Sequence, residues 1–288
     1  MDKQKPKEER ISRREFLKRV GCLGLAALLP GSVGYSFVEP HWLRVDRCRV
    51  PTPGLPPAFT NLQIVQLTDL HHGPWIDLDH INTAINMALG LAPDLIVVTG
   101  DNVHRSPKYI EPVYQALSVL KAPLGVYGVL GNHDQWEDED LVKTRRLMRG
   151  AGIVELTNTS AWLQRAGQYL CLAGVGDLWT DEQHLDQALS GVPHDATVIL
   201  LSHNPDYNEQ INDQRVKLMI AGHTHGGQIV LPLLGPLHLP SKYGCKYAGG
   251  LVRDDWKRVY VSRGVGMAVL PVRFGCRPEV SLLTLVPA

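Results

Sequence analysis

The sequence predicts an α/β fold, a layered sandwich of two mixed β-sheets flanked by helices. Two observations indicate this fold. Between residues 62 and 148, short aliphatic runs alternate with stretches in which apolar residues recur at helical spacing. From residue 170 onward, aliphatic runs continue with fewer helical stretches between them, which favours a second sheet of more mixed strand direction. The sequence shows no internal repeat and no low-complexity tract.

The first half of the chain follows the order β-α-β-α-β. Strands are expected over residues 62–68, 95–98 and 125–130, and helices over residues 81–89, 109–120 and 141–148. Asp79 is a candidate N-cap for the first helix. The third helix is expected to stop at Gly150 and Gly152, because glycine favours helix ends.

The second half supplies the strands of the second sheet. Strands are expected over residues 170–175, 197–201, 218–221, 228–231, 259–262 and 280–286.

Composition and charge are those of a globular protein with a sizeable core. The chain has 288 residues, of which 44% are hydrophobic and 20% charged. Lys and Arg total 29, as do Asp and Glu, but the first 38 residues hold eight basic and four acidic residues, which leaves 21 against 25. This slight acidic excess gives no broad positive surface, so no nucleic-acid binding is expected.

Residues 1–38 have the features of a twin-arginine signal peptide or an N-terminal anchor. Arg13 and Arg14 stand ahead of a modest apolar stretch, as in proteins that the twin-arginine export machinery carries. Residues 20–38 carry no charge and could just span a bilayer, while Ser32-Val33-Gly34 offers a cleavage site. Cleavage is favoured over a retained anchor. We therefore expect the protein to be exported to the periplasm or cell envelope. If the anchor is retained, the protein would be held at the membrane.

The rest of the chain divides into a linker and a single domain. Residues 39–59 are expected to be a linker because prolines recur between residues 51 and 57, and residues 60–288 form the domain. None of its cysteines forms a C-x-x-C pair, and disulfides are possible, but buried free thiols are favoured.

Polar motifs follow five of the predicted strands, at the point where each strand ends. They are Asp69-Leu70-His71, Gly100-Asp101, Gly131-Asn132-His133-Asp134, Ser202-His203 and Gly222-His223-Thr224-His225. In open α/β sheets, ligands collect outside the carboxyl ends of the strands. These motifs are therefore expected to converge on one pocket, although they are spread over 157 positions of sequence.

The residue types in these motifs suit two divalent metal ions. Imidazole nitrogens mixed with carboxylate and amide oxygens favour Mn²⁺, Fe²⁺/³⁺ or Zn²⁺ over Mg²⁺ or Ca²⁺. Seven candidate ligands are too many for one ion, whereas two ions about 3.5–4 Å apart can clamp a phosphoryl group. The candidates are Asp69, His71, Asp101, Asn132, His203, His223 and His225.

In this order the motifs DLH, GD, GNHD, SH and GHTH resemble those of the calcineurin-like metallophosphoesterases. The resemblance covers about residues 60–288. The extended GHTHGGQI and the ending VSRGVG to LPVRFGCRPEVSLL are similar to a bacterial phosphodiesterase branch that is often exported by the twin-arginine route. Hydrolases of UDP-2,3-diacylglucosamine are among the relatives of that branch.

The resemblance implies a role for each residue of the set. Asp69, His71 and His225 would hold one metal, and Asn132, His203 and His223 the other, with Asp101 as the bridge. His133 would act on the scissile phosphate, and Asp134 would hold the His133 imidazole in orientation.

Other residues near the motifs have alternative roles. His72 is expected either to line the pocket or to face solvent. His104 either tunes substrate choice or is an exposed loop residue, and the exposed residue is favoured. Arg263, Arg273 and Arg277 near the C-terminus could engage further phosphate groups of a substrate, or be ordinary surface residues.

The implied function is metal-dependent hydrolysis of phosphate esters, with a phosphodiesterase favoured. A UDP-diacylglucosamine-type pyrophosphate hydrolase is one alternative, and a non-catalytic, metal-dependent protein that binds a phosphorylated ligand is another. The substrate would be a phosphorylated small molecule or a lipid-linked phosphate. Residues 229–240 contain five leucines but also prolines, so a loop is expected there. These leucines either fill the core or form an exposed patch that contacts a membrane.

Overall fold

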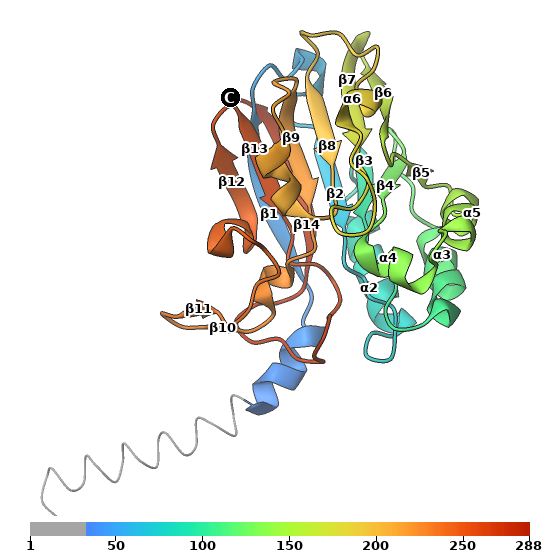
Figure 1. The fold of residues 1–288 in the computed structure, drawn as a ribbon, viewed down its shortest axis with the longest axis vertical. Helices are drawn as coiled ribbons and strands as arrows, with labels where there is room; N and C mark the ends of the chain where they lie inside the picture. Colours follow the sequence, from blue (N-terminus) through green and yellow to red (C-terminus); the bar gives the residue numbers. More distant parts are fainter. Residues whose placement is uncertain (1–32) are drawn as a thin grey trace, which may run out of the picture.

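A computed structural model describes residues 33–288. Residues 1–32 of the predicted signal segment therefore lie outside the described residues. Two six-stranded sheets lie face to face in this part of the chain (Figure 1). The first has the order β1 (Arg44–Thr52), β14 (Glu279–Pro287), β2 (Gln63–Leu67), β3 (Leu95–Thr99), β4 (Val126–Val129) and β5 (Val154–Glu155). The second has the order β12 (Gly250–Asp254), β13 (Lys257–Val261), β9 (Val216–Ala221), β8 (Val198–Leu201), β7 (Gln168–Gly174) and β6 (Thr159–Arg165).

Both sheets combine parallel and antiparallel strands. In the first sheet, β14 runs antiparallel to β2 and the pairs from β2 to β5 are parallel. In the second, β13, β9, β8 and β7 are parallel, and β12 and β6 are antiparallel additions at the two edges. The predicted fold class, a layered α/β sandwich of two mixed sheets flanked by helices, is confirmed.

Three apolar layers hold the sandwich together. Alternate residues of each strand point to opposite faces, so that Ile64 of β2 packs between the sheets while Val65 packs against the helices. The outer face of the first sheet is covered by α2 (Leu78–Gly90), α3 (Ile110–Leu117) and α5 (Val142–Gly150). The outer face of the second sheet is covered by shorter segments, among them α6 (Leu185–Ala188) and the 3-10 turns Pro205–Gln210 and Gly244–Tyr247.

The remaining elements are short. They are α4 (Asn132–Glu137), the hairpin strands β10 (Val230–Leu231) and β11 (Gly235–Pro236), and the 3-10 turns Glu39–His41, Pro57–Phe59, Pro107–Tyr109 and His225–Gly227. Between residues 33 and 288, no helix is long and apolar enough to cross a membrane. Four cysteines of the same part of the chain are free thiols, of which Cys171 and Cys276 are buried and Cys245 is exposed.

The structure corrects four predictions about the elements. Residues 39–59 are not merely a linker, because β1 lies within them and pairs along its whole length with β14. Residues 280–286 form a strand of the first sheet rather than the second. Residues 228–231 join neither large sheet and contribute only β10 to a small hairpin. The N-cap of α2 is Asp77, whose carboxylate accepts a hydrogen bond from the backbone N–H of His80.

Candidate metal centre

The seven predicted metal ligands lie together at one end of the two sheets. Each follows the carboxyl end of a parallel strand, namely β2, β3 and β4 in the first sheet and β8 and β9 in the second. All seven are nearly or fully buried. Their loops meet so closely that a side chain at Gly131 would collide with the Asp101 carboxylate. The convergence predicted from the strand ends is therefore what the fold produces.

The backbone of these loops is unusual. Asp69, His71, Asp101, His223 and His225 all have positive φ angles, between 49° and 70°. Non-glycine residues rarely adopt this left-handed conformation, and such strain is concentrated at functional sites. The sharp turns after the strands aim these side chains inward at one another.

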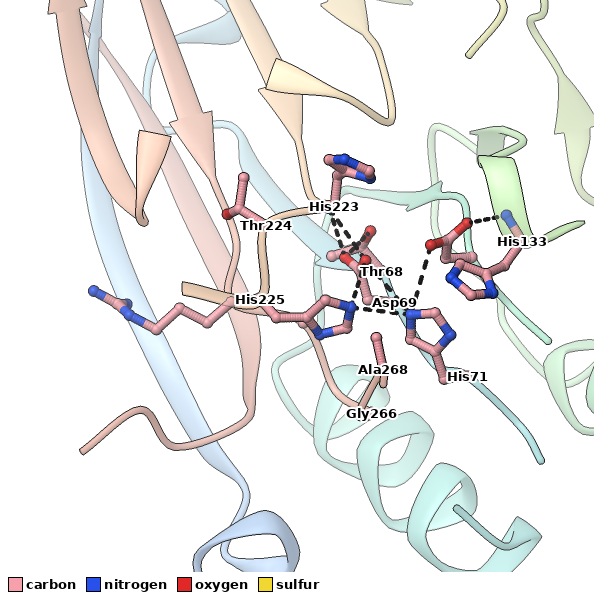
Figure 2. Close-up of polar contacts among 12 residues, drawn as sticks. Thr68, Asp69, His71, His133, His223, Thr224, His225, Gly266 and Ala268 are labelled. Atoms are coloured by element: carbon pink, nitrogen blue, oxygen red, sulfur yellow. Dashed lines mark hydrogen bonds and ion pairs between the residues drawn. The ribbon is translucent and has the colours of Figure 1, made fainter. Parts of the chain in front are cut away.

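One group of side chains consists of Asp69, His71 and His225 (Figure 2). The Nε2 atoms of His71 and His225 lie 3.0 Å apart. Oδ1 of Asp69 lies 3.3 Å from Nε2 of His225 and 3.9 Å from Nε2 of His71. Two ring nitrogens and a carboxylate oxygen thus point at one small space.

A second group consists of Asp101, His203 and His223. Oδ2 of Asp101 lies 3.2 Å from Nε2 of His203, and Nδ1 of His223 lies 3.2 Å from the same nitrogen. The same Asp101 oxygen lies 3.5 Å from Nε2 of His71. One oxygen therefore faces both groups.

Hydrogen bonds fix the orientation of these ligands. The Nδ1 of His203 donates to the carbonyl of Thr99 over 2.7 Å, which leaves the Nε2 lone pair free to face the centre. The backbone N–H of His223 donates to the Asp69 carboxylate. Within the described residues, the buried Oδ1 of Asn132 has no hydrogen-bond partner. An unpaired buried amide oxygen beside closely spaced imidazoles fits a divalent metal centre, because each of these atoms can then bind an ion.

Burial perturbs the acidities of the metal-free centre. Burial raises the pKa of Asp69 to about 6. It lowers the pKa of His223 to about 3 and that of His225 well below its usual value, so both rings are neutral and able to bind metal. Burial also acts to lower the pKa of His203, but the adjacent Asp101 carboxylate outweighs it, and the pKa ends well above its usual value.

His133 lies beside these groups rather than within them. Its backbone N–H donates to Oδ1 of Asp101 over 2.8 Å, and its ring lies edge-on to His71 with the ring centres 4.7 Å apart. Its Nδ1 lies 3.1 Å from Nδ1 of His104. The side chain is half-buried, which leaves it accessible to a substrate.

The predicted role of Asp134, to hold the His133 imidazole, is wrong. Its carboxylate instead accepts hydrogen bonds from the backbone N–H groups of Asp101, Asn102 and Gly131 at 2.9, 2.9 and 3.0 Å. These donors belong to the loops after β3 and β4. Asp134 therefore fastens together the two loops that carry the central carboxylate and the candidate ligand Asn132.

The residue nearest the His133 ring nitrogen is His104. It is buried, which corrects the expectation of an exposed loop residue. Its Nε2 accepts a hydrogen bond from Arg105 Nε over 3.1 Å. Burial lowers the pKa of His104 to about 4, so that its ring is neutral. His72 is also buried, and its Nδ1 bonds the carbonyl of Ile76 rather than facing solvent.

Two tryptophans outside the predicted motifs flank the centre. The ring centres of Trp136 and His133 are 4.6 Å apart, and those of Trp179 and His223 are 4.3 Å apart. Both are about half exposed. The position of Trp136, three residues after His133, was a readable signal because residues three apart share a helix face. No local pattern marks Trp179.

The three C-terminal arginines are engaged in contacts within the protein. Arg273 is fully buried and donates to backbone carbonyls, including that of Gly266. Arg263 pairs with the buried Glu279. Arg277 donates to the carbonyl of Trp42 and lies over its ring. These arginines support the loops around the metal centre.

Comparison with known proteins identifies the family. A model described as calcineurin-like phosphoesterase matches residues 62–227. The chain is 35% identical over 283 residues to an uncharacterized metallophosphoesterase, YkuE, of Bacillus subtilis, covering 96% of this chain and 98% of that protein. It is 32% identical over 292 residues to the phosphodiesterase YaeI of Escherichia coli, covering 96% and 100%. The chain is also 28% identical over 301 residues to a transmembrane protein with metallophosphoesterase domain from Danio rerio, and the match covers 100% of this chain and 67% of that protein. The chain belongs to the calcineurin-like phosphoesterases, which hydrolyse phosphoester bonds.

Proposed function

We propose that this protein is a phosphodiesterase that works with two divalent metal ions. The observation that carries the proposal is the position of Asp101, whose Oδ2 faces His71 on one side and His203 on the other. A single oxygen placed between two clusters of ligands is suited to bridge two ions. The mixture of nitrogen and oxygen donors favours Mn²⁺, Fe²⁺/³⁺ or Zn²⁺.

The proposed ligands follow the two groups of side chains. Asp69, His71 and His225 would hold one ion, and Asn132, His203 and His223 the other, with Asp101 shared. Bound there, the ions would supply an activated hydroxide and neutralise charge on the phosphoryl oxygens. The seven proposed ligands would fix the positions of the ions and so the orientation of the phosphoryl group. The buried loops that carry these ligands would limit the access of bulk water to it.

His133 is proposed to act on the substrate rather than on the ions. Its half-buried ring is beside the centre, where it can donate a hydrogen bond to a phosphoryl oxygen or protonate the leaving oxygen. Contact with the neutral His104 holds the ring in place without a competing negative charge. Trp136 packs edge-on against the other side of the ring.

A diester is favoured as the substrate over a monoester. The Escherichia coli relative, at 32% identity over its full length, is named a phosphodiesterase. Hydrolysis of a sugar-nucleotide pyrophosphate, such as a UDP-diacylglucosamine, is the alternative within the same chemistry. The arrangement of His133 beside the centre disfavours a protein that only binds a phosphorylated ligand, since binding does not need a proton donor there.

Turnover of bis-p-nitrophenyl phosphate by the metal-loaded protein tests the proposal. We expect hydrolysis with added Mn²⁺, and a loss of about 10²–10⁴ in rate for His133→Ala with metal content unchanged. As a control, His184→Ala removes an exposed histidine that pairs with Glu182 and should leave the rate unchanged. A wild-type protein that binds the diester without turnover would support the binding alternative instead.

Export by the twin-arginine route to the periplasm or cell envelope is part of the proposal. It rests on Arg13, Arg14 and the uncharged stretch of residues 20–38.

A further inference from the structure

An uncharged, apolar surface surrounds one side of the metal centre. Three segments build it: residues 33–38, the hairpin region 228–240, and the loop 264–272. Together these 28 residues contain no Asp, Glu, Lys or Arg, although 20% of the whole sequence is charged. In Figure 1 the hairpin formed by β10 and β11 projects from the same end of the molecule as the helix that begins the described chain. We call these three segments the apolar end.

Backbone hydrogen bonds of Arg273 and Phe274, which directly follow the loop 264–272, join the three segments. The N–H of Val230 donates to the carbonyl of Phe274 over 2.7 Å, and the N–H of Phe274 donates to the carbonyl of Gln228 over 2.8 Å. The N–H of Arg273 donates to the carbonyl of Ser36 over 3.0 Å. The side chain of Gln228 adds bonds to the carbonyls of residues 270 and 272. The apolar end is therefore a built part of the fold.

Several large side chains of the apolar end face outward, although Val265 and Met267 of the loop pack in the core. Leu233 is fully exposed, Leu234 and Val269 are 79% and 71% exposed, and Leu237 and Leu270 are more than half exposed. The prediction left open whether the leucines fill the core, and the structure shows that these leucines do not. Leu233 also has a φ of 68°, a conformation that a glycine would adopt with less strain. Neither folding nor packing explains a strained, fully exposed leucine at a hairpin tip.

The apolar end is continuous with the metal centre. The N–H of Gly266 donates to the carbonyl of Asp69 over 2.6 Å. Figure 2 shows Ala268 of the same loop next to the rings of His71 and His225. A groove of about 380 Å³ lies between the hairpin and the loop, and its lining includes His225, Leu237 and Leu270. An apolar group bound in this groove would thus contact His225, a proposed metal ligand.

We propose that the apolar end binds the surface of a lipid bilayer. Its border has the residues of a membrane interface: Trp42 is 54% exposed beneath the Arg277 guanidinium, and Lys242 and Tyr243 follow the hairpin region. In the sequence, residues 20–32 directly precede the apolar end and are also uncharged. Protein interfaces carry a polar rim and regularly spaced hydrogen bonds, and these three segments offer few hydrogen-bonding side chains.

Binding of the apolar end to a bilayer also defines the substrate class, which rests on the proposed function. With the apolar end in the bilayer, the metal centre faces the level of the lipid phosphates. The substrate class is then a phosphodiester carried by a lipid, with an acyl chain in the groove beside His225.

Hydrogen–deuterium exchange of the full chain, with and without vesicles of phosphatidylcholine and phosphatidylglycerol, locates the contact. We expect vesicles to slow exchange in residues 230–237 and 267–272. The double variant Leu233→Ser with Leu234→Ser should lose this protection and bind vesicles at least about tenfold more weakly. The matched control, Val119→Ser with Val142→Ser, changes two valines that are 53% and 66% exposed elsewhere and should behave as wild type. Equal melting temperatures would show that both variants are folded.

Other outcomes overturn the proposal. Protection confined to residues 1–32 would mean that the N-terminal segment alone binds lipid. Protection of the hairpin that increases with protein concentration in the absence of vesicles would assign the surface to a second copy of the chain. Exchange does not require turnover, so failure of the proposed function would appear separately, as no hydrolysis of soluble bis-p-nitrophenyl phosphate. If both hold, the leucine variant should lose rate on a diester embedded in vesicles and keep it on the soluble diester.

Discussion

Replacing Asp134 by asparagine separates the structural role of this residue from a catalytic one. The Asp134 carboxylate accepts three backbone N–H groups, two on Oδ2 and one on Oδ1. An asparagine offers one oxygen and one NH₂ group in the same shape, so at least one buried N–H loses its acceptor. The expected cost is about 1–3 kcal/mol. For a chain of this size, that lowers Tm by about 2–10 °C.

The same change should weaken metal binding, because one donor is the backbone N–H of the proposed ligand Asp101 and another is that of Gly131, which directly precedes the proposed ligand Asn132. Calorimetry and metal analysis of Asp134→Asn therefore go together: Tm, bound metal and rate should all fall, and excess metal should restore part of the rate. Asp138→Asn is a suitable control, since it removes a carboxylate that accepts the N–H of Thr144 and none from the loops that carry the proposed ligands. If Asp134→Asn kept its Tm and its metal but lost rate, Asp134 would act on His133 and the structural role would be refuted.

Three further predictions follow from the same geometry. His104→Ala should lower kcat about tenfold or more with metal content unchanged, because His133 loses its ring contact, and His104→Gln should recover part of the loss; unchanged kinetics of both would refute the positioning role. In the metal-free protein, Asp69 has a folded pKa of about 6, raised by burial, so the folded state holds the extra proton and loses stability as pH rises. Urea unfolding should show the stability of wild type relative to Asp69→Asn falling by about 3 kcal/mol between about pH 4 and pH 7, whereas a flat difference would contradict it. The double change Arg13→Lys with Arg14→Lys should leave a folded precursor in the cytoplasm, and unchanged export on cell fractionation would rule out the twin-arginine route.

The metal centre could be predicted because its signals are local. Each candidate ligand directly follows a buried strand, and parallel strands place their carboxyl ends at one edge. Asp69 and His225 are 156 positions apart in the sequence, yet both positions could be read from the strand ends. The residue types then predicted Mn²⁺, Fe²⁺/³⁺ or Zn²⁺ as the ions.

What the sequence did not reveal depends on long-range partners. Strand β1 contains Arg44, Asp46 and Arg47, and it becomes a strand by pairing with β14 more than 220 positions away. Asp134 was predicted to bond the His133 imidazole, but it accepts hydrogen bonds from three backbone N–H groups. The packing of the loops after β3 and β4 brings these groups to it. His104 is buried because Trp75 and His133 lie against it, which no local pattern records.

The most direct test of the two-metal site is a titration of the metal-free protein with Mn²⁺, with rate on bis-p-nitrophenyl phosphate and bound metal measured together. We predict that activity rises until about two equivalents are bound and then levels off. Asp101→Asn should bind metal weakly and stay inactive throughout, because it lacks the carboxylate that faces both groups. Full activity at one bound equivalent, or full activity of Asp101→Asn, would contradict the two-metal centre.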